Sequence, residues 1–295
     1  MIVDFPASKD FHSIANEWLI QSFQIIYDYS EELEYLGDWK DEDWHFHKGK
    51  LSTALVLIHQ SVEAKLKGEI CGISPYFLLD IKPQEWPTLP NSRDRNFNEL
   101  FTIGSEALLR VYLGLCKHKG DTKELVTLFE KVRVTRNKIV HGLHKDYLEP
   151  RYLLDLQFQA AREVFGLDFW TFLKEEERRH PLYRELRDDD LISALYYKLN
   201  FVERYLGSKR LKLFLSVSGR SYKCPRCTRR AQDWDYGSVY LAPNTPEARV
   251  ANCIICDYKF DIQRRRCESG NCRGNVIWAS EESETEICLS CLDEN

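Results

Sequence analysis

The stretch VRVTRNKIVHG, residues 132–142, places Arg136 and Asn137 where the apolar spacing of the preceding helix requires a core residue. The residues leading into it are apolar at intervals of three and four, the spacing that puts side chains on one helical face. Asp121 followed by Glu124 is typical of a capping box, so we expect this helix to begin near residue 121. Its apolar face consists of Leu125, Leu128, Phe129 and Val132.

The same helical period continues through the chain to Gly207 and predicts five further helices. Three prolines between residues 83 and 90 mark a long connection between two of them. The sequence therefore predicts a helical domain over residues 1–207. The expected helices cover residues 11–30, a segment starting at 51, and residues 98–116, 151–178 and 189–206.

One helix, starting at Leu51, also carries a polar stripe made of His59, Glu63 and Lys67. These residues are spaced by four and lie opposite the Leu/Ile/Val face of that helix. We interpret the stripe as a solvated face, in which the Glu–Lys pair contributes a few tenths of a kcal/mol.

Cysteines define the end of the chain, where eight of the ten follow residue 223 and six of these eight form C-x-x-C pairs. In a reducing cytosol such pairs bind metal rather than form disulfides. Eight thiolates predict two closed, tetrahedral four-cysteine zinc sites and two zinc ions per chain. We expect the first pair to join the second and the third the fourth, although the spacing also allows a cross-braced arrangement. The predicted ligands are Cys224, Cys227, Cys253, Cys256, Cys267, Cys272, Cys288 and Cys291.

The sequence changes character after Gly207. The run SKRLKLFLSV alternates like a strand, and short β-prone runs then separate the cysteine pairs. The first two cysteine pairs, together with the sequence DYKF that follows Cys256, resemble a zinc ribbon. The last two pairs resemble a second zinc ribbon. The predicted organisation is a mainly α chain: a helical domain, a basic linker over 208–222 and a small β-rich tandem zinc ribbon over 223–295.

Charge is segregated in this part of the chain. From Lys209 to Arg230 there are eight Lys or Arg residues and no acid, close to the aromatic Tyr222, Trp234 and Tyr236. That combination favours contacts with RNA phosphates and stacking on bases. The alternative is that the cations balance the negative charge of two zinc–tetrathiolate centres.

Composition adds few constraints. The formal net charge of −5 favours no particular partner, and no apolar run approaches the ~20 residues needed to span a membrane. The N-terminus lacks the basic and apolar regions of a secretory signal. We therefore expect a cytoplasmic protein that does not enter a membrane.

The residues Arg136, Asn137 and His141 resemble the HEPN superfamily, whose signature is Arg, four to six residues, then His, with a polar residue directly after the Arg. The resemblance covers about residues 45–145 and implies a dimeric helical bundle, often a metal-independent endoribonuclease of toxin or anti-phage systems. It implies an active site of Arg136, Asn137 and His141 with Glu63 as a supporting acid. In a subgroup of HEPN toxins a Tyr two residues after the His is modified to regulate the protein. This chain has Leu143 at that position, so we do not expect regulation by tyrosine modification.

These residue types suit RNA cleavage, because RNA carries its own nucleophile, the 2′-hydroxyl. A His of pKa near 6.5 can transfer that proton at neutral pH, and an Arg can bind phosphate oxygens in pairs. One motif His per chain leaves the second proton transfer to a partner chain, which favours a homodimer. The alternative is a structural cluster at a helix end, with Gly142 terminating the helix and His141 near its last carbonyls.

The expected function is a cytoplasmic, homodimeric endoribonuclease that acts as a toxin or defence effector and leaves 2′,3′-cyclic phosphate ends. Its zinc ribbons would recognise RNA, a protein trigger or an antitoxin. One alternative is a non-catalytic HEPN dimer that regulates by binding nucleic acid or protein through the ribbons. Another is a zinc protein associated with a ribosome or polymerase, with the helical domain as scaffold.

Overall fold

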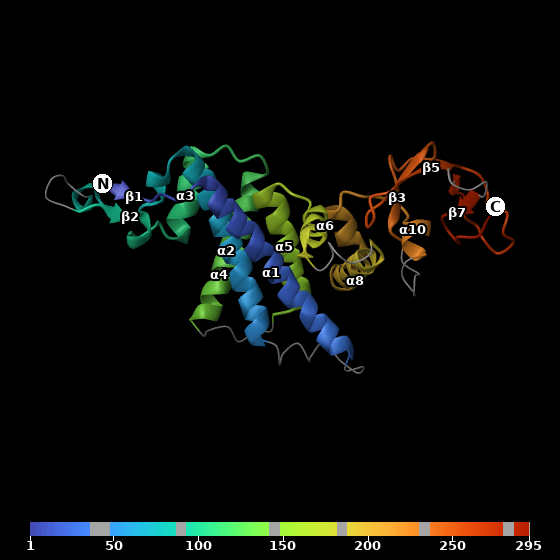
Figure 1. The fold of residues 1–295 in the computed structure, drawn as a ribbon, viewed down its shortest axis with the longest axis horizontal. Helices are drawn as coiled ribbons and strands as arrows, with labels where there is room; N and C mark the ends of the chain where they lie inside the picture. The colour runs from blue at the N-terminus through green and yellow to red at the C-terminus, as the bar shows by residue number, and fades with distance from the viewer. Residues whose placement is uncertain are drawn as a thin grey trace. The chain divides into compact units, whose positions relative to one another are not determined.

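The computed structural model describes residues 1–35, 48–86, 93–141, 148–181, 188–229, 237–279 and 286–294. The chain forms two compact units, Met1–Phe169 and Trp170–Asn295 (Figure 1). The predicted linker at 208–222 lies inside the second unit, whose helices begin well before it. Within the described ranges, no helix has the length and apolar character required to cross a membrane.

The first unit is a bundle organised around one central helix, α2. This helix packs against α1, α3, α4 and α5, so it is buried on several sides rather than on one face. Its small residues permit this: a Cβ on Gly68 would lie 2.3 Å from the His12 ring of α1. The bundle helices are α1 (Ser8–Tyr35), α2 (Lys48–Ile73), α3 (Ser105–Leu115), α4 (Thr122–Val140) and α5 (Pro150–Ala160).

Helix α4 begins where the sequence predicts. Asp121 is its N-cap, and the carboxylate accepts a hydrogen bond of 2.8 Å from the backbone N–H of Lys123. The buried residues of α4 are the predicted apolar face, Leu125, Leu128, Phe129 and Val132. Local sequence therefore determines both the start of this helix and the face that it turns to the core.

Two predicted helices are shorter than expected. The segment 98–116 begins as a 3-10 turn, η4 (Phe97–Glu99), and becomes helical only at Ser105. The segment 151–178 is interrupted after a π turn, η5 (Ala161–Phe165), by Gly166 with a φ of 63°. A left-handed residue ends an α-helix, and α6 (Phe169–Arg179) starts a new one.

Short segments that the sequence did not predict close one end of the first unit. Strands β1 (Ile2–Val3) and β2 (Arg95–Asn96) form a two-stranded parallel pair. Two 3-10 turns, η2 (Pro75–Leu78) and η3 (Pro83–Glu85), lie in the proline-containing connection.

The second unit combines helices with a five-stranded antiparallel sheet in which sequence neighbours pair throughout, in the order β3–β4–β5–β6–β7. The central strand β5 pairs with β4 on one side and with β6 on the other, so one sheet continues through both cysteine groups. The strands are β3 (Val239–Leu241), β4 (Val250–Cys253), β5 (Lys259–Gln263), β6 (Ile277–Ala279) and β7 (Glu286–Cys288), and the helices are α6, α8 (Asp188–Leu206), α9 (Ser208–Phe214) and α10 (Pro225–Thr228).

The prediction of a strand in SKRLKLFLSV is wrong, because Ser208–Phe214 forms the helix α9. Leu211 and Phe214, three residues apart, are both buried, whereas Leu213 is 55% exposed. The spacing that looks alternating is therefore the i, i+3 spacing of a short helix. Gly207, with a φ of 79°, separates α9 from α8.

Side-chain contacts join α6 to the sheet. The Trp170 indole N–H donates a 2.7 Å hydrogen bond to the carbonyl of Ile254, in the turn after β4. Asp257 in the same turn forms ion pairs with Lys174 and Arg178. These contacts explain why the second unit includes helices as well as the cysteine-rich sheet.

Candidate active site and metal centres

A polar cluster lies where α2 meets α4. His59 is only 1% exposed, and its ring lies 6.4 Å, centroid to centroid, from Phe129 of α4. Its Nδ1 lies 3.8 Å from Oε2 of Glu63, and Oε1 of Glu63 accepts a hydrogen bond from Ser105 of α3. Neither ring nitrogen of His59 has a hydrogen-bond partner in the described structure. The prediction of a solvated stripe is therefore wrong for His59.

The predicted motif residues occupy the last turns of α4. Nη1 of Arg136 donates a 2.9 Å hydrogen bond to Oδ1 of Asn137, and both side chains are half-buried. Nε of Arg136 is buried and has no hydrogen-bond partner among the described residues. His141 caps the C-terminus of α4 and is exposed, with its backbone N–H bonded to the Asn137 carbonyl at 3.0 Å.

The structure thus brings part of the predicted set together. Arg136 lies close enough to His59 for its charge to act on the imidazole, and Glu63 lies beside the same ring. His141 is on the exposed end of the helix, one turn beyond Asn137 on the same face. Gly142 and Leu143 lie outside the described residues.

Positive charge predominates around His59. Its pKa is lowered, chiefly by burial; Glu63 opposes this, while Arg136, Arg133 and Lys67 add to it. Arg133 is paired with Glu130 at 2.7 Å, which leaves Arg136 and Lys67 facing a single carboxylate and a neutral imidazole. Such a surplus of cations suits an anion such as a phosphate group.

Sequence reasoning left two members of this cluster out of the site, His59 and Ser105. For Ser105 we find no signal in the sequence. For His59 a signal exists, because Ser61, Ala64 and Gly68 form a second face of small residues on α2, outside both the Leu/Ile/Val face and the polar stripe. Small residues on a second face permit another helix to approach, and a helix packed on two faces has no solvated stripe.

The burial of His59 predicts a pH dependence of stability. Because its pKa is lower in the folded chain than its ordinary value of 6.5, the unfolded chain takes up this proton first as pH falls. The stabilisation is complete above about pH 6.5 and is lost progressively below it. We expect the free energy of unfolding, from urea titrations between pH 7.5 and 5, to fall with a slope that His59→Gln reduces.

The slope, rather than the absolute stability, is the measured quantity, because any substitution at a buried site also costs packing. His141→Gln, at an exposed position, is the matched control and should keep the wild-type slope. His12, whose pKa is also lowered mainly by burial, would leave some slope in every variant. Equal slopes for His59→Gln and wild type would contradict the prediction.

The eight predicted cysteine ligands form two groups of four that could each hold a metal ion. In each group all sulfur atoms lie within 4.8 Å of one another. In the first group, Sγ of Cys224 lies 3.8 Å from that of Cys256, and Sγ of Cys227 lies 3.7 Å from that of Cys253. The corresponding distances in the second group are 3.8 Å and 3.9 Å. A tetrahedral site with Zn–S bonds of ~2.3 Å has S–S edges of ~3.8 Å, so the geometry fits zinc.

The grouping is sequential, as predicted, and the cross-braced alternative is excluded. The groups are Cys224, Cys227, Cys253 and Cys256, then Cys267, Cys272, Cys288 and Cys291.

Backbone amides also point at the ligand sulfurs. The N–H of Cys227 lies 3.4 Å from Sγ of Cys224, and the N–H of Gly274 lies 3.2 Å from Sγ of Cys272. Such N–H···S contacts stabilise the thiolate that a metal requires.

The two remaining cysteines have a different environment. Cys71 is buried and donates to the carbonyl of Pro6 at 3.2 Å, and burial raises the pKa of its thiol. Burial also raises the pKa of the half-buried Cys116. Raised pKa values disfavour the reactive thiolate, in agreement with the interpretation of both as small packing residues.

No family model, curated protein or solved structure matches this chain at a significant level. The HEPN resemblance is therefore carried by the motif residues and their placement alone, and it stays a prediction.

Proposed function

We propose that the first unit is a HEPN-type, metal-independent endoribonuclease. The observation that carries the proposal is Arg136, a cation with a buried Nε that has no hydrogen-bond partner among the described residues, held on α4 beside a neutral His59 and Glu63. An exposed imidazole, His141, lies at the end of the same helix. A charge acceptor for phosphate and a proton-transfer group are the two components that cleavage by the 2′-hydroxyl needs.

In this proposal each side chain has a defined task. Arg136 binds the phosphate and stabilises the charge that develops in the transition state, while its hydrogen bond to Asn137 fixes the guanidinium orientation. His141 takes the proton of the 2′-hydroxyl or returns one to the leaving 5′-oxygen. Glu63 and His59 are positioning residues: they lie on α2 and orient Arg136 of α4 without touching the substrate.

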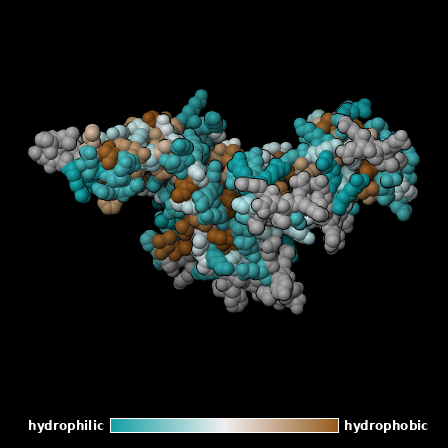
Figure 2. All heavy atoms as spheres, in the orientation of Figure 1, coloured by the Kyte–Doolittle hydropathy of each residue, from teal (hydrophilic) through white to brown (hydrophobic). Residues whose placement is uncertain are grey.

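A second copy of the chain would supply the second imidazole. The motif half of α4 exposes Val134 and Val140, which are 44% and 53% accessible, and Figure 2 shows hydrophobic surface over this helix. Aliphatic surface beside the motif supports a symmetric dimer that places two copies of His141 at one cleft.

For the second unit we propose two structural zinc ions, each bound by four thiolates with no open coordination position. Zinc bound in this way supplies folding energy rather than reactivity. The toxin or defence role, with a protein trigger or antitoxin as partner, is proposed from the family resemblance. The competing candidate is a non-catalytic dimer that binds nucleic acid or protein through the basic residues of the second unit.

The decisive experiment measures cleavage of a labelled RNA by the full-length protein in EDTA, with metal content checked before and after. We expect cutting without added divalent ions and 2′,3′-cyclic phosphate ends, and its loss in His141→Ala. Lys138→Ala, an exposed cation of the same helix, is the matched control and should remain active. Dependence on Mg²⁺, equal cutting of DNA, or an active His141→Ala protein would favour the binding candidate.

A further inference from the structure

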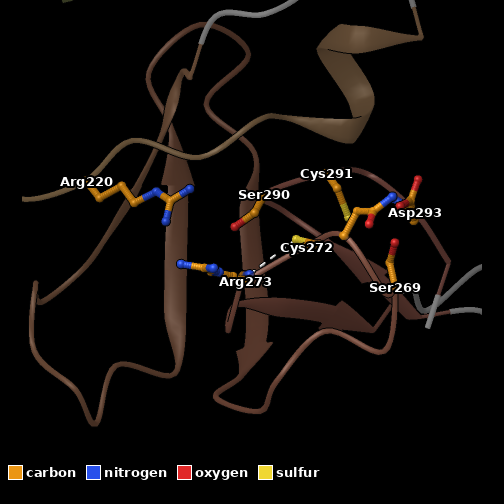
Figure 3. A pocket seen from close by; sticks show the side chains of 9 residues that line it. Arg220, Ser269, Cys272, Arg273, Ser290, Cys291 and Asp293 are labelled. Atoms are coloured by element: carbon orange, nitrogen blue, oxygen red, sulfur yellow. Dashed lines mark hydrogen bonds between the residues drawn. The ribbon is translucent and has the colours of Figure 1, made fainter.

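A pocket of about 300 Å³ lies beside the second cysteine group, within the second unit (Figure 3). Its walls come from the loop between Cys267 and Gly274, from the residues that follow β7, and from Arg220. Cys272 and Cys291, two ligands of the metal centre, form part of the wall. The site is therefore built on a segment that the metal holds in place.

Arg220 reaches this pocket from an earlier part of the chain because the segment after it is fixed to both halves of the sheet. Tyr222 exchanges backbone hydrogen bonds of 2.8 and 2.9 Å with Val239 of β3. The N–H of Lys223 donates at 2.8 Å to the carbonyl of Leu289, which follows β7. These bonds hold Arg220 beside Arg273 although the two are far apart in sequence.

The pocket holds two guanidinium groups and one acid. Arg220 and Arg273 are both exposed, and neither forms an ion pair within the described part of the chain. Asp293 is the acidic residue among the lining side chains. By contrast, the nearby Arg265 is paired with Glu268 and Glu286. The two guanidinium groups repel each other, and the negative charges nearest to them are Asp293 and the cysteine thiolates of the second group. An anion that enters the pocket between the two guanidinium groups is attracted by both.

Neutral donors line the same pocket. Oγ of Ser290 is buried and has no hydrogen-bond partner in the described structure, and Figure 3 shows this hydroxyl turned to the side where both guanidinium groups lie. A Cβ on Gly274 would lie 2.6 Å from this oxygen, so only glycine leaves it room. Asn271 and Ser269 add an amide and a second hydroxyl.

We propose that this pocket binds a backbone phosphate of single-stranded RNA, with Arg220 and Arg273 as paired donors and Ser290 as a neutral donor. Guanidinium groups bind phosphate oxygens in pairs, and hydroxyl groups complete such sites. The other cations between Lys209 and Arg229 give the same strand further phosphates to contact. The choice of RNA as the ligand rests on the proposed function of the first unit. The inference that the pocket binds a phosphate group rests only on the residues that line it.

The test is fluorescence anisotropy of a labelled 2′-O-methyl RNA, which lacks the nucleophile and cannot be cleaved, with the full-length protein. We expect Arg220→Gln and Arg273→Gln each to weaken binding about tenfold, since hydrogen bonds to charged groups are the strong ones. The double variant should lower the slope of log K against log salt by about 0.7, the contribution of one phosphate of a single strand. Arg249→Gln, which removes an exposed arginine outside the pocket, should weaken binding less than about threefold.

Three outcomes overturn the proposal. An equal loss in Arg249→Gln would show diffuse electrostatic attraction rather than a site. Unchanged RNA affinity with reduced metal content in the pocket variants would show that both arginines only balance the metal–tetrathiolate charge. Binding of inorganic phosphate to the pocket with an affinity equal to that for the RNA would point to free phosphate as the ligand. Because the RNA is not cleavable, a failure here is distinct from a failure of the nuclease proposal.

Discussion

Cys227→Ser is expected to reduce the metal content from two ions to one per chain and to unfold the first cysteine group. The side chain is 0% exposed, and its sulfur lies 3.7 Å from that of Cys253. Strands β3 to β5 are only three to five residues long and form little core of their own. In small zinc modules the metal contributes on the order of 10 kcal/mol, more than such a sheet can replace.

The loss should extend to the second group. Strand β5 pairs with β4, which carries Cys253, and with β6, so disorder in the first half removes one neighbour of the second. We expect the remaining ion to leave faster when the variant is treated with a chelator. Elemental analysis and the rate of metal transfer to a coloured chelator measure both effects.

Cys116→Ser is the matched control, since Cys116 lies in neither cysteine group, and it should keep two ions. Two ions retained by Cys227→Ser, or iron in place of zinc in the wild-type protein, would contradict the assignment of the sites.

Arg136→Ala should lower the rate of RNA cleavage by about a hundredfold to a thousandfold, the loss expected when one charge-stabilising group is removed from an active site. The effect on stability should be small, because the side chain is half-buried and donates its hydrogen bond to the adjacent Asn137 rather than to another helix. Arg136→Lys keeps the charge but not the planar pair of donors, so we expect a rate between those of wild type and Arg136→Ala.

Single-turnover rates and thermal melts of the same preparations test this prediction. Arg151→Ala, an exposed arginine on α5 of the same unit, is the control and should cleave at the wild-type rate. If Arg136→Ala cleaves normally, or if it loses activity only because it unfolds, Arg136 does not stabilise the transition state.

Much of the metal chemistry follows from the sequence alone. Two cysteines separated by two or four residues are close in any compact turn, so the sequence predicts the four pairs of ligands. The fold decided which pairs share a site. Helix α4 is equally local, because an Asp N-cap and apolar residues spaced by three and four determine its start and its buried face. Arg136, Asn137 and His141 could be singled out for the same reason, as side chains within two turns of one helix.

Tertiary structure decided the features that depend on contacts between distant segments. The pattern of α2 alone predicts that His59 is exposed to solvent, but α4 covers this side chain in the fold. The same packing brings Arg136 close enough to lower the pKa of His59. Ser208–Phe214 appears strand-like and forms a helix because burial selects residues three apart. Arg220 and Arg273 line one pocket because backbone bonds from Tyr222 and Lys223 fix the intervening chain. Spacing in sequence determines local geometry, whereas the surroundings of a side chain depend on which remote surface packs against it.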